Sequence, residues 1–137
     1  GAGGAGAIAK AEALGLKSSS SPSIGQLRAA GQKDAHHIIQ DAAVKQLPGY
    51  NTNAAPGVKL VGPPNTPGTP HYNATQSQRL AGGGGTYAAE RRIGYKALRR
   101  AGVEAEEARG HIQRADTYFE SIGVTPQTQT RIPGNRR

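Results

Sequence analysis

The sequence has no cysteine, methionine or tryptophan and only one phenylalanine. The absence of cysteine excludes disulfides and zinc sites built from thiolates, so the fold does not depend on a redox compartment. Aliphatic residues are also scarce: Leu, Ile, Val and Phe together number 21 of 137 residues, whereas Gly and Pro number 29. So small an apolar fraction, combined with a high net charge, predicts a small core with much irregular structure. We expect its folded state to depend on a metal ion or a partner.

Long apolar runs are missing as well. The sequence has no cationic start followed by an apolar stretch and no segment apolar enough to span a bilayer, so it indicates neither a signal peptide nor a membrane partner. Residues 1–20 are rich in Gly, Ala and Ser, which is typical of a linker. We therefore predict a linker over residues 1–20, one domain over residues 21–124, and a mobile, polar, basic tail over residues 125–137.

Negative charge is in short supply. Lys and Arg number 17 against 9 Asp and Glu, which gives a formal net charge of +8 and a pI near 10.2. This excess favours a polyanionic partner, of which nucleic acid is the commonest. A helix predicted over residues 86–101 concentrates it, with an apolar face formed by Ala89, Ile93, Ala97, Leu98 and Ala101. The candidate nucleic-acid-binding residues on this helix are Arg92, Tyr95, Lys96, Arg99 and Arg100. The alternative is an ordinary solvated helix face.

The adjacent histidines His36 and His37 are the most informative residues that the sequence does contain. One imidazole can bind a metal ion while its neighbour accepts a proton. In an extended strand successive side chains point to opposite faces, so the two rings would take different tasks. The alternative is a surface pair in a loop that binds metal adventitiously.

The segment downstream supplies a third histidine. Residues 58–61 predict a short strand, and Thr69 and Pro70 are typical of the cap and the first position of a helix. His71 would then lie in the first turn, where the partial positive charge of the helix N-terminus favours a neutral imidazole that can bind metal. Prolines between residues 56 and 70 would stiffen the loop that carries Asn65.

Together these residues resemble a known family. Residues 35–39, with the sequence AHHII, are similar to the signature of the AHH-type nucleases of the HNH and endonuclease VII (His-Me finger) superfamily. The region of Asn65 and His71 resembles the second half of their motif. The resemblance implies an α+β fold in which a small ββα-metal core carries additional helices and long irregular loops. It also implies a nuclease of the kind found at the C-terminus of bacterial polymorphic toxins.

The resemblance assigns a role to four residues. By it, His37 is the general base, and His36 and His71 are ligands of one divalent cation. Asn65 would orient the base or complete the metal shell.

Two positions depart from the family pattern, and the second of them leaves the set of metal ligands incomplete. Gln40 stands where many relatives have Pro, and Thr75 stands one turn after His71, where a further histidine ligand would be. The third protein ligand therefore stays open between Asn65, Asn73 and Asp34. A hard cation with water in its remaining positions favours Mg²⁺, with Mn²⁺ and Zn²⁺ as alternatives.

Further helices and a connector are expected around this motif. A short helix from Ser21, with Pro22 in its first turn, should end at Gly31, and Asp41 should cap a second helix that ends at Leu47. The glycine run of residues 82–85 predicts a flexible connector, with a hinge over the substrate as the alternative.

The last predicted helix has the most regular apolar pattern. Its apolar residues recur at spacings of three and four before Gly123, at Ala105, Ala108, Ile112, Ala115, Phe119 and Ile122. This helix is acidic, so we expect it either to pack against the basic helix or to face a cationic partner, and we expect His111 beside its apolar stripe to be structural.

These expectations combine in a metal-dependent endonuclease, with DNA favoured over RNA as its substrate. The resemblance further implies a toxin effector that a larger carrier polypeptide or a secretion machine exports, and that acts in the cytoplasm of a target cell. An acidic immunity protein would protect the producer. Two alternatives remain: a metal-independent ribonuclease that uses the 2′-hydroxyl as its nucleophile, and a nucleic-acid-binding module without catalysis.

Overall fold

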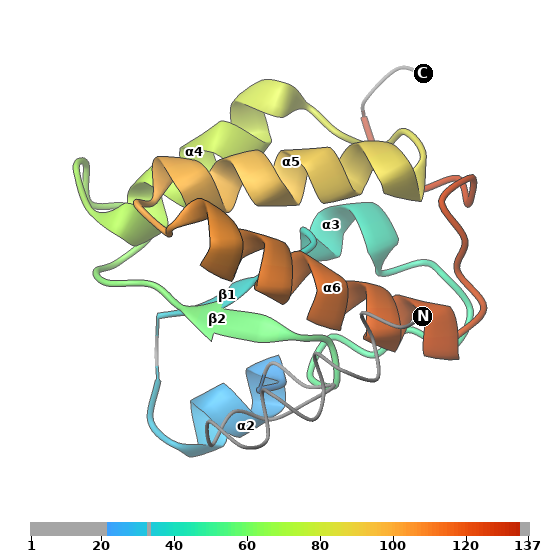
Figure 1. Ribbon diagram of the computed structural model, residues 1–137, viewed down its shortest axis with the longest axis horizontal. Coiled ribbons are helices and arrows are strands. Elements are labelled where there is room, and N and C mark those ends of the chain that lie inside the picture. The colour runs from blue at the N-terminus through green and yellow to red at the C-terminus, as the bar shows by residue number, and fades with distance from the viewer. Residues whose placement is uncertain (1–21, 33, 135–137) are drawn as a thin grey trace.

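Helices surround a small two-stranded sheet in the described part of this α+β chain (Figure 1). The computed structural model describes residues 22–32 and 34–134, so the linker predicted over residues 1–20 lies outside the described residues. Within this part the elements are α2 (Ile24–Ala29), β1 (Ala35–His37), α3 (Asp41–Val44), β2 (Gly57–Lys59), α4 (Pro70–Ala81), α5 (Tyr87–Arg100) and α6 (Ala105–Ser121). None of these helices is long and apolar enough to cross a membrane.

The histidine pair lies on β1, as predicted. β1 pairs with β2 in antiparallel register, which places His36 opposite Val58 and His37 opposite Gly57. The second strand ends two residues before the end of the predicted strand. Helix α2 packs on this sheet so closely that a Cβ on Gly57 would lie 2.4 Å from Cδ1 of Ile24.

Side-chain hydrogen bonds shift the boundaries of the two short helices. Helix α2 begins after Ser23 and not at Ser21, because the side chains of Ser23 and Gln26 form a reciprocal capping box. The prediction that Asp41 caps α3 is wrong, and this helix ends at Val44. Asp41 is its first residue, and its carboxylate accepts hydrogen bonds from the loop that contains Tyr50 instead.

Helices α5 and α6 pack together and cover the face seen in Figure 1. Asp116 of α6 accepts two hydrogen bonds from Arg91 of α5, at 2.7 and 2.8 Å, which confirms the expected pairing of the acidic and basic helices. The apolar stripe of α6 is confirmed, with Phe119 buried between Tyr50 and Tyr87. The main core lies beneath α6, and its largest fully buried side chain is that of Phe119.

The buried face of α5 differs from the predicted one. Ala97 and Leu98 are buried as expected, but Glu90 is only 1% exposed, whereas Ile93 is half-buried. Burial of the Glu90 carboxylate is compensated by hydrogen bonds from the Gly84 amide (2.8 Å) and the Gln40 side chain (2.7 Å).

The glycine run and the C-terminal segment pack on the body of the protein. A Cβ on Gly83 would lie 2.4 Å from the Gln40 amide, and the backbone there has a positive φ, so the run is a tight turn and not a flexible connector. Residues 125–132 were expected to be mobile, yet Thr130 is 1% exposed and the Arg131 amide donates to the carbonyl of Ala43. Residues 135–137 lie outside the described residues.

Candidate active site

The first cluster of candidate site residues joins β1 to α4. The Thr69 hydroxyl caps α4 by accepting a hydrogen bond from the Tyr72 amide (3.1 Å), and Pro70 begins the helix, as predicted. His71 therefore lies in the first turn, where its ring is 6% exposed, against His36, which is 4% exposed. The two ring centroids are 5.4 Å apart and the planes are nearly perpendicular. Two imidazoles from different elements thus lie against each other in one buried region.

A hydrogen bond selects the tautomer of His71, and burial lowers the pKa of His36. Nδ1 of His71 lies 3.2 Å from the carbonyl oxygen of Gly62; a carbonyl only accepts, so Nδ1 donates and Nε2 keeps its lone pair. Nε2 of His36 lies 3.4 Å from the side-chain amide of Gln78 on α4. Burial, and then the neighbouring His71 and His37, lower the pKa of His36 to about 3. His36 is therefore neutral near pH 7, the form that binds metal.

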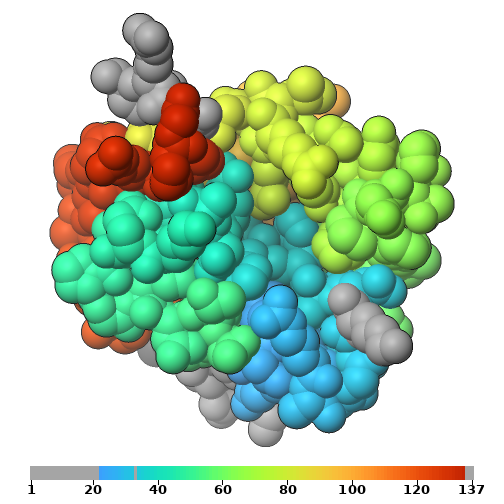
Figure 2. Space-filling view, turned by 180° about the vertical axis from the view of Figure 1, so that it is seen from behind, coloured from blue at the N-terminus to red at the C-terminus, as the bar shows by residue number. Residues whose placement is uncertain are grey.

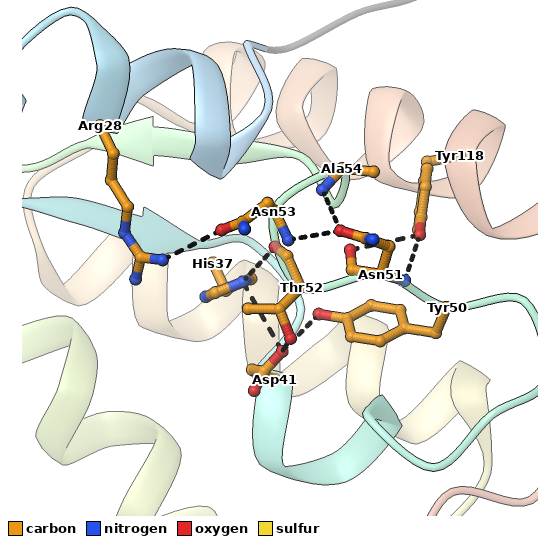
Figure 3. Close-up of polar contacts among 9 residues, drawn as sticks. All are labelled: Arg28, His37, Asp41, Tyr50, Asn51, Thr52, Asn53, Ala54 and Tyr118. Carbon is orange, nitrogen blue, oxygen red and sulfur yellow. Dashed lines mark hydrogen bonds and ion pairs between the residues drawn. The ribbon is translucent and has the colours of Figure 1, made fainter.

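A second cluster surrounds His37, on the opposite side of β1 (Figure 3). Nε2 of His37 lies 3.1 Å from the carbonyl oxygen of Thr52 and 3.8 Å from a carboxylate oxygen of Asp41. The same Asp41 oxygen accepts hydrogen bonds from the hydroxyls of Tyr50 (2.7 Å) and Thr52 (2.9 Å). These bonds fix both groups that face Nε2 of His37, and with Nε2–H donating to Thr52 its Nδ1 is the basic atom.

Burial and the neighbouring charges together lower the pKa of His37. Burial is the largest effect and lowers its pKa; the hydrogen bond to Thr52 and the charge of Asp41 oppose this, and the charge of Arg28 adds to it. The net pKa lies below the usual value, so the imidazole is free to accept a proton at neutral pH. Arg28 reaches from α2 toward the loop beside His37 and donates to the side chain of Asn53 at 3.2 Å (Figure 3).

His36 and His71 are the residues of this site that could hold a divalent cation. Both rings are buried, they come from two different elements, and burial keeps His36 in the neutral form that binds metal. Among the described residues no third His, Asp or Glu lies close enough to complete a metal-binding group, so Asp34 is not part of the cluster. The remaining positions of a cation would therefore go to water or to an amide such as that of Gln78.

Two predicted asparagines are not brought to either cluster. Asn65 is exposed in the turn before α4, and no hydrogen bond between described residues joins it to His37. Asn73 follows His71 by two positions, which is about 200° around a helix, so it faces a different side of α4.

The predicted nucleic-acid-binding residues are separate from the histidines. Arg92, Tyr95 and Lys96 line a groove of about 490 Å³ between α5 and α6, together with Arg91 and Arg109. Arg99 and Arg100 are exposed in the last turn of α5. Seen from behind, the protein is hollowed at its centre between α2, the segment after α3, and α4, with the colour of β1 at the floor (Figure 2).

Four residues of the two clusters were not identified from the sequence: Gln78, Asp41, Thr52 and Arg28. Gln78 could have been found, because a residue seven positions after His71 lies two turns along the same helix face. Asp41 was read as a helix cap, which is the commoner role of an aspartate in that position. Thr52 acts through its backbone and Arg28 through the packing of α2, so the sequence held no signal for either.

Comparison with known protein families gives one match. Residues 30–120 match the family model Tox-SHH, described as an HNH/Endo VII superfamily toxin with a SHH signature. The superfamily that the sequence suggested is therefore confirmed, whereas the match is to the SHH-signature family and not to the AHH type; Ala35 precedes the two histidines here. Searches of curated proteins and of solved structures found no match. The matched segment contains His36, His37 and His71 and covers most of the chain, which therefore belongs to the Tox-SHH family of HNH/Endo VII superfamily toxins.

Proposed function

We propose that this chain is a metal-dependent endonuclease toxin that hydrolyses DNA, with one divalent cation at His36 and His71 and with His37 as the general base. One observation carries the proposal: a buried pair of imidazoles from β1 and α4 lies next to a third, neutral histidine whose ring is held by Thr52. The fold of a two-stranded sheet followed by α4 is consistent with an HNH-type nuclease. Mg²⁺ is the proposed ion, because it tolerates water in most of its coordination positions.

The chemistry of each histidine follows from its surroundings. Nδ1 of His37 would take the proton from a water molecule that attacks phosphorus, while Nε2–H stays bonded to the Thr52 carbonyl. His36 and His71 would hold the cation through ring nitrogens, and burial keeps that of His36 unprotonated. A bound cation would supply Lewis-acid stabilisation of the charge on the phosphate and the departing 3′-oxygen.

The two clusters flank the same three-residue strand. β1 pairs with only one described strand, so its other edge is free of sheet partners in that part of the chain. A phosphodiester placed at this edge would have His37 on one side of the strand and the His36–His71 pair on the other. Arg28 lies beside His37 and would add positive charge to this side of the phosphate.

The α5 residues that were predicted to bind nucleic acid face another side of the molecule. Figure 1 shows α5 and α6 on one face of the molecule and Figure 2 shows the hollow on the opposite face, so a long duplex bound in the hollow would reach the groove between these helices only by following the surface around the molecule. We propose that these α5 residues add sequence-independent phosphate contacts outside the reaction centre. An acidic immunity protein, a larger carrier, and delivery into the cytoplasm of a target cell complete the proposed role as an interbacterial effector.

A plasmid assay tests the function. Purified protein is incubated with supercoiled DNA, and in parallel with RNA, in Mg²⁺, in Mn²⁺, and in chelator. We expect nicking of DNA that chelator abolishes, and a loss of about 10² to 10⁴ in rate for His37→Ala with metal affinity retained. Cleavage of RNA alone that survives chelator would replace this function with a metal-independent ribonuclease. Binding of DNA without cleavage under all conditions would indicate a non-catalytic binding module.

A further inference from the structure

We propose that Gln78 is the third protein ligand of the cation, through its side-chain carbonyl oxygen; this rests on the proposed metal site. The chain has Thr75 where a further histidine ligand was expected, and no other His, Asp or Glu among the described residues completes the cluster. Gln78 is the amide that the fold brings to His36. It is 7% exposed, so its amide is held in the same buried region as the two rings.

Helix geometry places Gln78 on the face of His71. Seven residues are almost two full turns, so the two side chains project from the same side of α4, about 10 Å apart along its axis. Side chains on a helix lean toward its N-terminus, which tilts Gln78 back toward His71. The ring of His36 contacts both side chains, because it lies edge-on to His71 and its Nε2 faces the Gln78 amide.

The distance between His36 and Gln78 suits two ligands of one ion. Their polar atoms are 3.4 Å apart, which is long for a hydrogen bond. Two neighbouring ligand atoms that each lie about 2.1 Å from an octahedral cation are about 3.0 Å apart. The amide and the ring are therefore within a few tenths of an ångström of the spacing that two ligands of one ion would have, and a small side-chain movement would bring them there.

The orientation of the amide can change with occupancy. The nitrogen and oxygen of a glutamine side chain exchange places by a rotation of the amide. Nε2 of His36 can accept a hydrogen bond from the amide nitrogen or, in the other tautomer, donate one to the amide oxygen. A cation on the Nε2 lone pair of His36 would repel the amide N–H groups and attract the carbonyl oxygen. Gln78 would then complete a set of two imidazoles and one amide oxygen.

Glutamate and leucine substitutions separate a ligand from a hydrogen-bond donor. Mn²⁺ affinity of the metal-free protein is measured by calorimetry and by electron paramagnetic resonance of free Mn²⁺, with folding checked by circular dichroism. We expect Gln78→Leu to weaken Mn²⁺ binding by about 10-fold or more. Gln78→Glu keeps an oxygen but removes the donor, so it should bind Mn²⁺ at least as tightly as the wild type. The matched control is Gln76→Glu, the same chemical change about 200° away on α4, which should leave the affinity within about 2-fold.

Each outcome decides between the two roles. Wild-type affinity in Gln78→Leu, or affinity in Gln78→Glu as weak as in Gln78→Leu, would overturn the assignment and leave Gln78 as a donor that orients His36. If Gln78→Leu does not fold, the comparison of Gln78→Glu with Gln76→Glu decides alone: Mn²⁺ affinity clearly weaker in Gln78→Glu than in Gln76→Glu would then overturn the assignment, whereas equal or tighter binding supports it. Absence of Mn²⁺ binding by the wild type would overturn the proposed metal site itself. Binding that is lost in His36→Ala but kept in Gln78→Leu would overturn only the role of Gln78.

Discussion

Gly94 in the middle of α5 lets this helix approach the end of β1, and replacing it should show how tightly the site is packed. A Cβ at this position would lie 2.6 Å from the backbone carbonyl oxygen of Ile38. This oxygen belongs to the backbone, so it cannot rotate away as a side chain can. The preceding residue on the chain is His37, so any movement of this backbone would disturb the site. The change Gly94→Ala must therefore displace either α5 or the residues that follow the histidine pair.

Two opposing effects set the size of this loss. Alanine is better than glycine in a helix interior by about 1 kcal/mol, whereas overpacking of a core costs about 1 to 3 kcal/mol. Because the obstructing atom belongs to the backbone, we take the upper end of that range, which leaves a net loss of about 2 kcal/mol. For a folded part of this size the midpoint of thermal unfolding should fall by about 8 °C.

Gly110 in α6 is the matched control. A Cβ there would lie 3.3 Å from the end of the Arg114 side chain, which can move by a few tenths of an ångström. Gly110→Ala should therefore stabilise the protein by about 0.5 to 1 kcal/mol through helix propensity alone. Both variants are measured by urea and thermal unfolding followed by circular dichroism. A Gly94→Ala protein as stable as the wild type would refute the close approach of α5 to Ile38.

Three further predictions concern charge and the site. Because the pKa of His36 is lowered to about 3 in the folded protein, the imidazole of the unfolded chain is protonated below about pH 6.5 while that of the folded chain stays neutral. Stability should therefore fall as pH drops below about 6.5, by about 2 kcal/mol between about pH 7 and about pH 5; in chelator, His36→Asn should lessen this slope, and an unchanged slope would contradict the assignment. Asp41→Asn removes the charge beside His37, so the apparent pKa of the base in a pH–rate profile should fall, whereas a profile identical to wild type would exclude this coupling. Changing three exposed cations of α5 to Glu should weaken DNA binding at all sequences and flatten the dependence of affinity on salt concentration. The three residues are Arg92, Lys96 and Arg99. Unaltered DNA binding by this triple variant would mean that this helix face is only solvated.

Local sequence was sufficient for those features that depend on neighbouring residues. Thr69 and Pro70 begin α4 because a hydroxyl cap and a residue without an amide hydrogen are favoured there wherever the helix lies. The stripe of α6 was evident from its period, since the residues that repeat at three and four positions must share one face. The histidine pair also carried enough of the family pattern to indicate the superfamily that the family match confirms.

Tertiary structure alone decided which polar groups meet. Glu90 was excluded from the predicted apolar face because a carboxylate is costly to bury, yet Gln40 and the amide of Gly84 satisfy it there. The glycine run is also held by groups that are distant in sequence, because the carbonyl oxygens of Gly84 and Gly85 accept hydrogen bonds from Gln129 and Thr130. Gln78 meets His36 only because α4 packs across β1, 42 residues away along the chain. The period of a sequence gives the face on which a residue lies, but the hydrogen bonds that compensate burial come from elements whose approach is set by packing.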